Sequence, residues 1–335
     1  MIESKKNVRY SILELDAVGT GISIQETFEN SLDLARQVEA MGYHRFWLAE
    51  HHNMVSIASS ATAVLIGHIA GGTKKIRVGS GGIMLPNHSP LIVAEQFGTL
   101  GSLYPGRIDL GLGRAPGTDQ VTAHAIRSDR MQAVFKFPEE VSQIRQYFSE
   151  ENKNAKVRAT VAEGVEVPIY ILGSSTDSAH VAASKGLPYA FASHFAPAQL
   201  FDALNIYYNH FQPSKFLDRP YTIAGINVIA AETDEEAERI STTLLRMMLG
   251  VMTGQIDYMQ KPTEMTPQLR ELAQNPAFQR MLKYAFVGSK DSVREKTEDF
   301  LRQTGVDEVM VASHIYSHED RIESYRLFSE VMKEI

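Results

Sequence analysis

Cysteine is absent from this 335-residue chain. Disulfide bonds, thiolate metal ligands and cysteine nucleophiles are therefore excluded. No window approaches the ~18 consecutive apolar residues of a membrane-spanning helix. Residues 1–16 also lack an apolar run of the length that a signal peptide needs. The lack of cysteine fits a reducing compartment, and together these absences predict a soluble, cytoplasmic protein that does not act at a membrane.

Neither sign of charge is concentrated in the sequence. The chain has 33 Lys and Arg against 40 Asp and Glu, a formal net charge of −7, and no dense run of basic residues. Nucleic-acid-binding proteins carry basic patches that neutralise phosphates, so no nucleic-acid partner is predicted. The composition, 44% hydrophobic and 22% charged, is ordinary for a globular protein.

Glycine is concentrated at the ends of two predicted strands within residues 76–117. One strand ends in Gly79, Gly81 and Gly82, and the other contains Gly111 and Gly113. Glycine permits a close approach of backbone to a ligand or to another strand. A strand–helix–strand unit with such ends predicts a ligand at the carboxyl edge of a parallel sheet.

Eight segments are rich in β-branched and aromatic residues, and helical patterns separate them. The predicted strands are 8–15, 43–49, 76–85, 107–113, 168–172, 187–194, 221–231 and 307–313. This alternation favours one (β/α)8 TIM barrel, of class α/β, over a two-domain Rossmann protein. We predict a single domain over residues 1–335, with inserted segments near 151–167 and 253–287.

The segment GLGRAPG, residues 111–117, does not fit a dinucleotide-binding fingerprint. Its glycines are spaced G-x-G-x-x-x-G, and Pro116 interrupts the place where a pyrophosphate-binding helix would start. Arg114 is instead predicted to be a cation at the rim of the fourth strand. The alternative is a surface arginine paired with a carboxylate.

Three serines lie at the end of the fifth strand and in the first turn of the next helix: Ser174, Ser175 and Ser178. Free N–H groups and the positive end of the helix dipole favour an anion there, and serine hydroxyls add donors. Simple capping of the helix, without any ligand, is the alternative.

Two adjacent histidines follow the second strand, His51 and His52, directly after Glu50. Neighbouring residues of a strand point to opposite sides, so the pair is a poor chelator and no metal site is predicted. One of them is placed to face the barrel mouth as an acid, a base or a hydrogen-bond donor. A purely structural histidine is the alternative. Likewise, Gly81 and Gly82 favour either tight strand packing or a flat ligand against the main chain.

In combination, these segments resemble the bacterial luciferase-like flavin monooxygenases, especially their single-chain subgroup. The resemblance is carried by WLAEHHN at 47–53, VGSGGIMLPNHSP at 78–90, AEQFGTLGSLYPGRIDLGLGRAPG at 94–117 and the phosphate-binding segment that begins with LGSS at 172–175. It implies a barrel, usually dimeric, that binds reduced FMN (FMNH2). In that family reduced flavin reacts with O2 to give a C4a-hydroperoxide, which oxygenates an organic substrate.

The resemblance also assigns roles to single residues. His51 matches the family's catalytic histidine, and Gly81–Gly82 matches a non-proline cis peptide under the flavin ring. The positions that match phosphate contacts are Arg114, Ser174, Ser175 and Ser178. Luciferase has a cysteine near its flavin site, which this chain lacks, so light emission is not implied. The segment 253–287 falls where luciferase has a mobile lid.

The leading hypothesis is a homodimeric FMN-dependent monooxygenase that takes FMNH2 from a separate flavin reductase, because no nicotinamide-binding motif is present. Its partners would be the reductase, O2 and a small organic substrate that the sequence does not identify. Two alternatives share the fold: a deazaflavin (F420)-dependent oxidoreductase that transfers hydride, and a flavin-binding protein without turnover.

Overall fold

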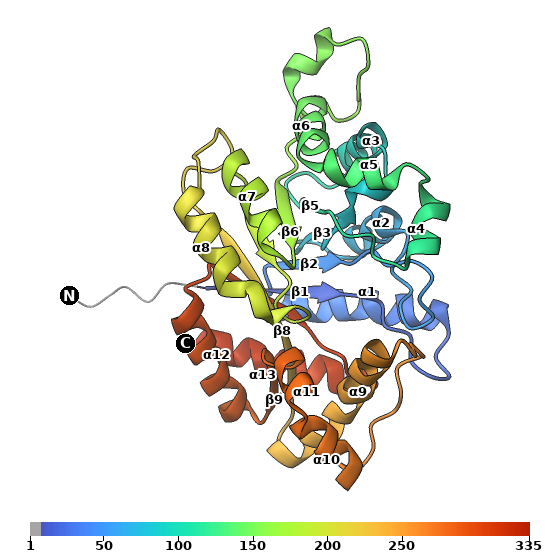
Figure 1. Cartoon of the computed structure of the whole chain (residues 1–335), viewed down its shortest axis with the longest axis vertical. Coiled ribbons are helices and arrows are strands. Elements are labelled where there is room, and N and C mark those ends of the chain that lie inside the picture. The colour runs from blue at the N-terminus through green and yellow to red at the C-terminus, as the bar shows by residue number, and fades with distance from the viewer. Residues whose placement is uncertain (1–7) are drawn as a thin grey trace, which may run out of the picture.

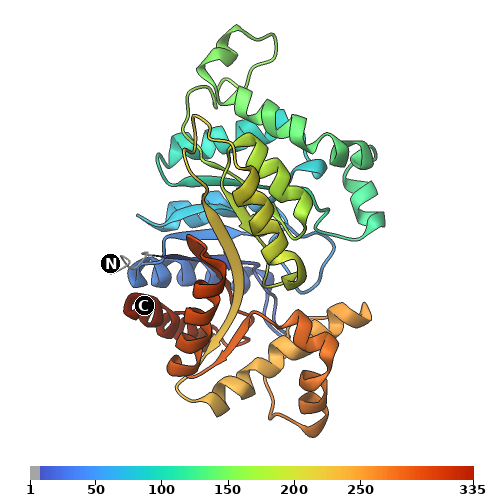
Figure 2. The same ribbon diagram turned by 60° about the vertical axis from the view of Figure 1, so that its left-hand side comes forward.

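The computed structural model describes residues 8–335 and shows a closed parallel barrel surrounded by helices (Figures 1 and 2). Eight strands within these residues form the ring: β1 (Arg9–Glu14), β2 (Arg45–Leu48), β3 (Arg77–Ser80), β5 (Ile108–Gly113), β6 (Ile169–Gly173), β7 (Tyr189–Phe191), β8 (Thr222–Ala230) and β10 (Glu308–Ala312). The pairing of β10 with both β1 and β8 closes it. The predicted TIM barrel and its eight strands are confirmed. The prediction that residues 1–16 lack the apolar run of a signal peptide falls partly on residues 1–7, which lie outside the described residues.

Helices cover the outside of the barrel. They are α1 (Ile24–Met41), α2 (Thr62–Gly72), α3 (Pro90–Leu103), α4 (Gln120–Ile126), α5 (Arg130–Phe135), α6 (Phe137–Tyr147), α7 (Thr176–Lys185), α8 (Leu200–His210), α9 (Asp234–Thr253), α10 (Pro267–Gln274), α11 (Pro276–Met281), α12 (Lys290–Thr304) and α13 (His318–Glu334). The caps of α1 follow the sequence: the Ser23 hydroxyl accepts from the Glu26 N–H, and Gly42 ends the helix at a φ of 92°. No helix within residues 8–335 is long and apolar enough to cross a bilayer.

Both predicted insertions interrupt the strand–helix alternation. The first follows α6, contains a short 3-10 turn at Glu150–Asn154, and projects from the top of the molecule in Figure 1. The second carries α10 and α11 after α9 (Figure 1). It also contains a strand that the sequence analysis did not predict, β9 (Ala285–Gly288), which pairs with β8 outside the ring. The third predicted strand is split, because a two-residue strand, β4 (Ile83–Met84), pairs separately with β5.

Inward-facing residues recur at every second position of each strand and form layers. At the amino ends of the strands, Arg45 pairs with Asp109 and Glu308, each at 2.8 Å. Above this buried network lies an apolar layer in which Trp47 and Tyr170 meet edge to face, with ring centroids 4.9 Å apart. The next inward positions lie at the carboxyl ends of the strands. The layered interior therefore determines which residues reach the barrel mouth.

Glycines let β3 and β5 approach each other closely. A Cβ on Gly111 would lie 2.1 Å from the Ser80 carbonyl oxygen, and one on Gly82 would lie 2.7 Å from the Gly111 carbonyl oxygen. Both obstacles are backbone atoms, which cannot move without separating the strands. Ser80 strengthens this contact, since its hydroxyl donates to the Gly111 carbonyl at 2.8 Å and accepts from the Gly111 N–H at 2.9 Å.

Gly111→Ala should destabilise the protein by about 1–3 kcal/mol or more, because the added methyl group overpacks this strand pair. Gly67→Ala in α2 is the matched control. There the added Cβ meets only Leu100 Cδ2 at 3.4 Å, and alanine favours a helix by about 0.5–1 kcal/mol over glycine. Thermal melting of both variants measures the difference. Equal melting temperatures would contradict the proposed strand contact.

Candidate functional site

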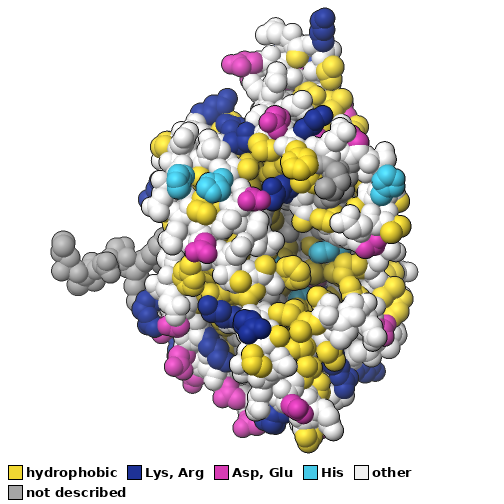
Figure 3. Space-filling model, viewed as in Figure 1, with side chains coloured by type: hydrophobic (Ala, Val, Ile, Leu, Met, Phe, Trp, Pro, Cys, Tyr) yellow, Lys and Arg dark blue, Asp and Glu magenta, His cyan; other side chains and the backbone are white. Residues whose placement is uncertain are grey.

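A cavity of about 580 Å³ opens at the carboxyl ends of the barrel strands. Figure 3 shows a hollow in this face in which hydrophobic and histidine side chains are visible. Strand ends supply one part of the wall, and residues 246–260, from the end of α9 and the segment after it, supply another. Most of the sequence-predicted site residues line it: His51, Gly81, Arg114, Ser174, Ser175 and Ser178. Of the predicted set, Gly82 alone is not among the lining residues.

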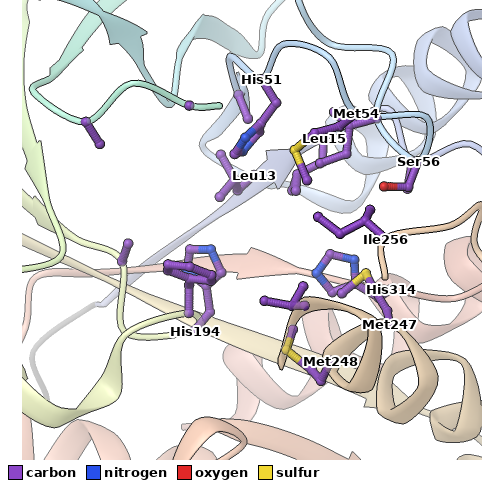
Figure 4. A pocket seen from close by; sticks show the side chains of 18 of the residues that line it. Leu13, Leu15, His51, Met54, Ser56, His194, Met247, Met248, Ile256 and His314 are labelled. Atoms are coloured by element: carbon purple, nitrogen blue, oxygen red, sulfur yellow. The ribbon is translucent and has the colours of Figure 1, made fainter. Parts of the chain in front are cut away.

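The adjacent histidines separate as the strand alternation predicts. His51 faces the cavity (Figure 4), whereas the His52 ring lies 2.9 Å from Glu50 Oε1. Burial alone would raise the pKa of Glu50, but hydrogen bonds from His52 and His88 lower it to about 2. Glu50 also accepts from the Met84 N–H at 2.9 Å. The buried Glu50 carboxylate therefore joins the segment after β2, which carries His51, to residues 84–88.

Burial lowers the pKa of His51, and a hydrogen bond to the Gly117 backbone offsets only part of this effect. The imidazole is therefore neutral at neutral pH and carries one N–H donor and one acceptor nitrogen. Within residues 8–335, no group of three His, Asp or Glu side chains is arranged to hold a metal ion. The geometry of His51 thus suits hydrogen bonding and proton transfer.

The peptide bond between Gly81 and Gly82 is cis, as the family resemblance implies. Gly81 lines the cavity, and a Cβ there would lie 2.6 Å from Leu13 Cδ1. Gly82 lies against Gly111 of β5. Backbone packing therefore excludes a side chain at Gly82, whereas a side chain at Gly81 would displace the Leu13 side chain. Gly81 leaves bare backbone at the cavity wall.

Arg114 and the start of α7 meet at the cavity rim. Arg114 Nη2 donates to Asp177 Oδ2 at 2.7 Å, and the two side chains are 38% and 62% exposed. Arg114 is thus paired with a carboxylate, which was the alternative that the sequence left open, and it also lines the cavity. An exposed pair of this kind contributes little to stability, so Arg114 remains suited to an exchangeable anion.

The three serines differ in their surroundings. Ser175 occupies the N-cap position of α7, but its hydroxyl makes no capping hydrogen bond. Ser174 is exposed at the cavity. Ser178 is only 6% exposed; its hydroxyl donates to the Ser175 carbonyl at 2.9 Å and lies 3.1 Å from the Tyr189 hydroxyl. Ser174 and Ser175, with the first N–H groups of α7, are the donors best placed for an anion.

Two further histidines line the cavity, His194 and His314, and the sequence analysis did not single them out. Each lies just beyond the end of its strand, four residues after an apolar-layer residue, Ala190 or Met310. Counting in twos along β7 and β10 would have placed both at the mouth. That signal was present in the sequence.

Methionines make much of the cavity apolar. Five of them line it: Met54, Met84, Met247, Met248 and Met259. Met259 belongs to the segment 254–260, which is hydrogen-bonded to the loop after β1. The Met259 N–H donates to the Val18 carbonyl, and the Thr20 N–H donates to the Met259 carbonyl, each at 2.9 Å. The inserted region thus covers the cavity where the resemblance implies a lid.

The two added histidines should make the folded protein sensitive to acid. Burial lowers the pKa of His194 to about 4 and that of His314 to about 3, with further lowering by His51 and by His194 respectively. The unfolded chain, with pKa values near 6.5, binds these protons first, so stability should fall as the pH drops below about 6.5. Between pH 7 and pH 5 the loss should be at most about 2 kcal/mol per histidine.

Thermal melting across this pH range tests the expectation. The double variant His194→Gln/His314→Gln should show a shallower loss of melting temperature than the wild type. His210→Gln, at an exposed position on α8, should leave the pH profile unchanged. Parallel pH profiles for all three proteins would contradict the assignment of neutral, buried imidazoles.

Solved structures of other proteins show the same architecture. The structure of apo-MsnO8 superposes with a TM-score of 0.88 at 33% identity and covers 97% of this chain and 98% of that one. Two more share the fold at lower identity. They are the oxygenating component of 3,6-diketocamphane monooxygenase from Pseudomonas putida in complex with FMN (18%, TM-score 0.73, covering 98% and 99%) and an F420-dependent secondary alcohol dehydrogenase (16%, TM-score 0.67, covering 97% and 98%).

Related sequences extend this likeness to a family. A luciferase-like monooxygenase from Escherichia coli K12 is 45% identical and covers 98% of both chains. An N-acetyl-S-alkylcysteine monooxygenase from Bacillus subtilis is 38% identical over 69% of this chain and 70% of its own. The family model described as luciferase-like monooxygenase matches residues 8–308. This chain, with its closed barrel and its cavity at the carboxyl ends of the strands, therefore belongs to the luciferase-like monooxygenase family.

Proposed function

We propose that this chain is an FMN-dependent monooxygenase that uses reduced FMN and O2 to oxygenate a small organic substrate. One observation carries the proposal: a single cavity joins an anion-binding end, at Arg114 and the start of α7, to the His51 imidazole and the Gly81 backbone. In the overall reaction one oxygen atom enters the substrate and the other leaves as water. FMNH2 supplies the two electrons and becomes FMN.

The rim of the cavity has donors that fit a phosphate. Arg114 offers guanidinium N–H groups, Ser174 and Ser175 offer hydroxyls, and the start of α7 offers unpaired backbone N–H groups. A phosphate held there would replace the Asp177 carboxylate as the acceptor of the Arg114 hydrogen bond. Ser178 would act less directly, because its hydroxyl is already bonded within the protein.

The inner part of the cavity has the residues to support oxygen chemistry. When bound, reduced FMN would supply the electrons that activate O2. The neutral His51 imidazole has an N–H with which to donate a hydrogen bond or a proton to the reacting oxygen, and the Glu50 network keeps its loop in place. Methionine side chains and residues of the segment 254–260 line this region and make it largely apolar.

Two partners belong to this proposal. A separate flavin reductase would deliver FMNH2, because the sequence has no dinucleotide-binding fingerprint. A homodimer is proposed because the family resemblance implies one; Val64 of α2 and Leu103 of α3 are exposed apolar side chains on neighbouring helices, at 72% and 63%.

Anaerobic titration with reduced cofactors tests the choice of FMN. FMNH2 should bind at micromolar concentrations, and reduced F420 should bind at least tenfold more weakly. Tighter binding of reduced F420 would favour the hydride-transfer alternative. Binding of FMNH2 without oxygenation of any compound in a broad substrate panel would favour a flavin-binding protein without turnover.

Variants at the rim locate the phosphate within the same titration. Arg114→Ala should weaken FMN binding by about 10–100-fold, because a charge-assisted hydrogen bond is lost. Asp177→Asn should strengthen it, because the competing carboxylate is removed. Neither change should alter the binding of riboflavin, which lacks the phosphate. Arg302→Ala, at a 74%-exposed arginine on α12, is the control. Equal loss of FMN and riboflavin affinity would contradict a phosphate contact at Arg114.

A further inference from the structure

The tripeptide Ala-Ser-His occurs at the ends of the two strands that flank β8. Residues 192–194 follow β7, and residues 312–314 begin at the last residue of β10. In both copies the serine hydroxyl donates to a β8 carbonyl: Ser193 to Gly225 at 2.6 Å and Ser313 to Val228 at 2.8 Å. The two serines therefore tie their segments to the same strand. The histidine that follows each of them lies on the inward-facing side.

A glycine in β8 makes room for the first histidine. A Cβ on Gly225 would lie 2.2 Å from His194 Nδ1. His194 Nδ1 is buried and has no hydrogen-bond partner among residues 8–335. The His194 carbonyl accepts from Asn227 Nδ2 at 2.8 Å, so the backbone of this residue is fixed. The His194 ring therefore lies against β8 at Gly225, and His194 also lines the cavity.

The second histidine, His314, is 6% exposed and lies beside the first along one wall (Figure 4). The charged groups behind it are Arg321 and Glu14, which pair at 3.2 Å. Burial, together with His194 and Arg321, keeps the His314 imidazole neutral. Two neutral imidazoles, each with one N–H, thus line the same wall from the two sides of β8.

The remainder of this part of the cavity is apolar. Figure 4 places Leu15, Met54 and Ile256 around the histidine wall, with Met247 and Met248 below. The acidic residue that lines the cavity is Asp257, which is exposed and accepts from the Tyr258 N–H at 2.7 Å. The inner wall therefore offers hydrogen-bond donors in apolar surroundings. The cations that line the cavity are Arg114, at the rim, and Arg246, whose guanidinium donates to the Thr263 hydroxyl at 3.1 Å. At the histidine wall itself a cation meets no carboxylate, and an anion would lose its hydration against uncharged imidazoles.

We propose that His194 and His314 form the polar recognition site for the organic substrate, and that the group they bind is a neutral carbonyl-type oxygen on an apolar body. Two imidazole N–H groups from the strands on either side of β8 can both donate to such an oxygen, which has two lone pairs. The apolar body would fill the methionine-lined space, which adapts to shape because methionine is flexible. This inference deepens the proposed function, since it names the substrate class of the same cavity. His51 stays available for the oxygen chemistry.

The test uses probes that share one shape and differ in one group: cyclohexanone, methylenecyclohexane and cyclohexanecarboxylate. Their binding to FMN-loaded protein at pH 7.5 is measured by ligand-detected NMR. The wild type should bind cyclohexanone about tenfold more tightly than methylenecyclohexane, because two hydrogen bonds are gained. It should bind the carboxylate more weakly than the ketone. Tightest binding of the carboxylate would overturn the assignment of a neutral acceptor.

Variants connect the preference to the two histidines. His194→Leu/His314→Leu should bind the ketone and the alkene equally, whereas His194→Gln/His314→Gln should keep part of the preference, because glutamine retains an N–H donor. His210→Gln is the control. Thermal melting identifies a variant that does not fold, in which case the glutamine pair and the two single variants carry the test. An unchanged ketone preference in the folded variants would overturn the proposal.

Failure of this inference and failure of the proposed function give different results. All variants should bind FMN as the wild type does, since neither histidine lies in the Arg114 rim. Absence of FMN binding in the wild type would contradict the FMN proposal, and the probes would then be tested on the FMN-free protein. Normal FMN binding without any ketone preference would contradict only the histidine site.

Discussion

The structure depends on one geometric constraint, the two-residue alternation of side chains around a closed parallel barrel. Each strand end presents one residue to the mouth, and the layers beneath determine which residue that is. The Arg45 pairs with Asp109 and Glu308 join three strands at the amino ends. A one-residue slip of any of these strands would separate the pairs and turn the mouth residue outward. The buried network therefore maintains the position of the site from the opposite end of the barrel.

Glycine has two consequences in the same scaffold. At Gly82 and Gly111, the lack of a side chain lets β3 and β5 pack closely against each other. Gly81, beside Gly82, presents bare backbone to the cavity, and Arg114, directly after the end of β5, lines the same cavity. At Gly225 the same lack of a side chain accommodates the His194 ring. The glycine pattern thus reflects strand packing first, and the shape of the cavity follows from it.

Much of the fold could be predicted from the sequence, since strand patterns, caps and glycine-rich ends are local signals. Local signals also placed His51, Arg114 and the serines at strand ends. β9 could not be found this way, because it pairs outside the ring and lies at the end of the second insertion, where the strand–helix alternation is interrupted. The contact of the Ser178 hydroxyl with the Tyr189 hydroxyl joins α7 to β7, so it is not a local signal. Whether Met259 faces the core or the cavity depends on how its segment pairs with residues 18–20.

We propose that the cavity brings a neutral His51 imidazole to the place where bound reduced FMN would meet O2. The most direct measurement mixes FMNH2-loaded wild type and His51→Ala with oxygenated buffer in a stopped-flow spectrometer and follows flavin reoxidation. We predict equal FMNH2 affinity for the two proteins, but rates of flavin reoxidation that differ by about tenfold or more. Identical reoxidation traces at equal FMNH2 occupancy would contradict it.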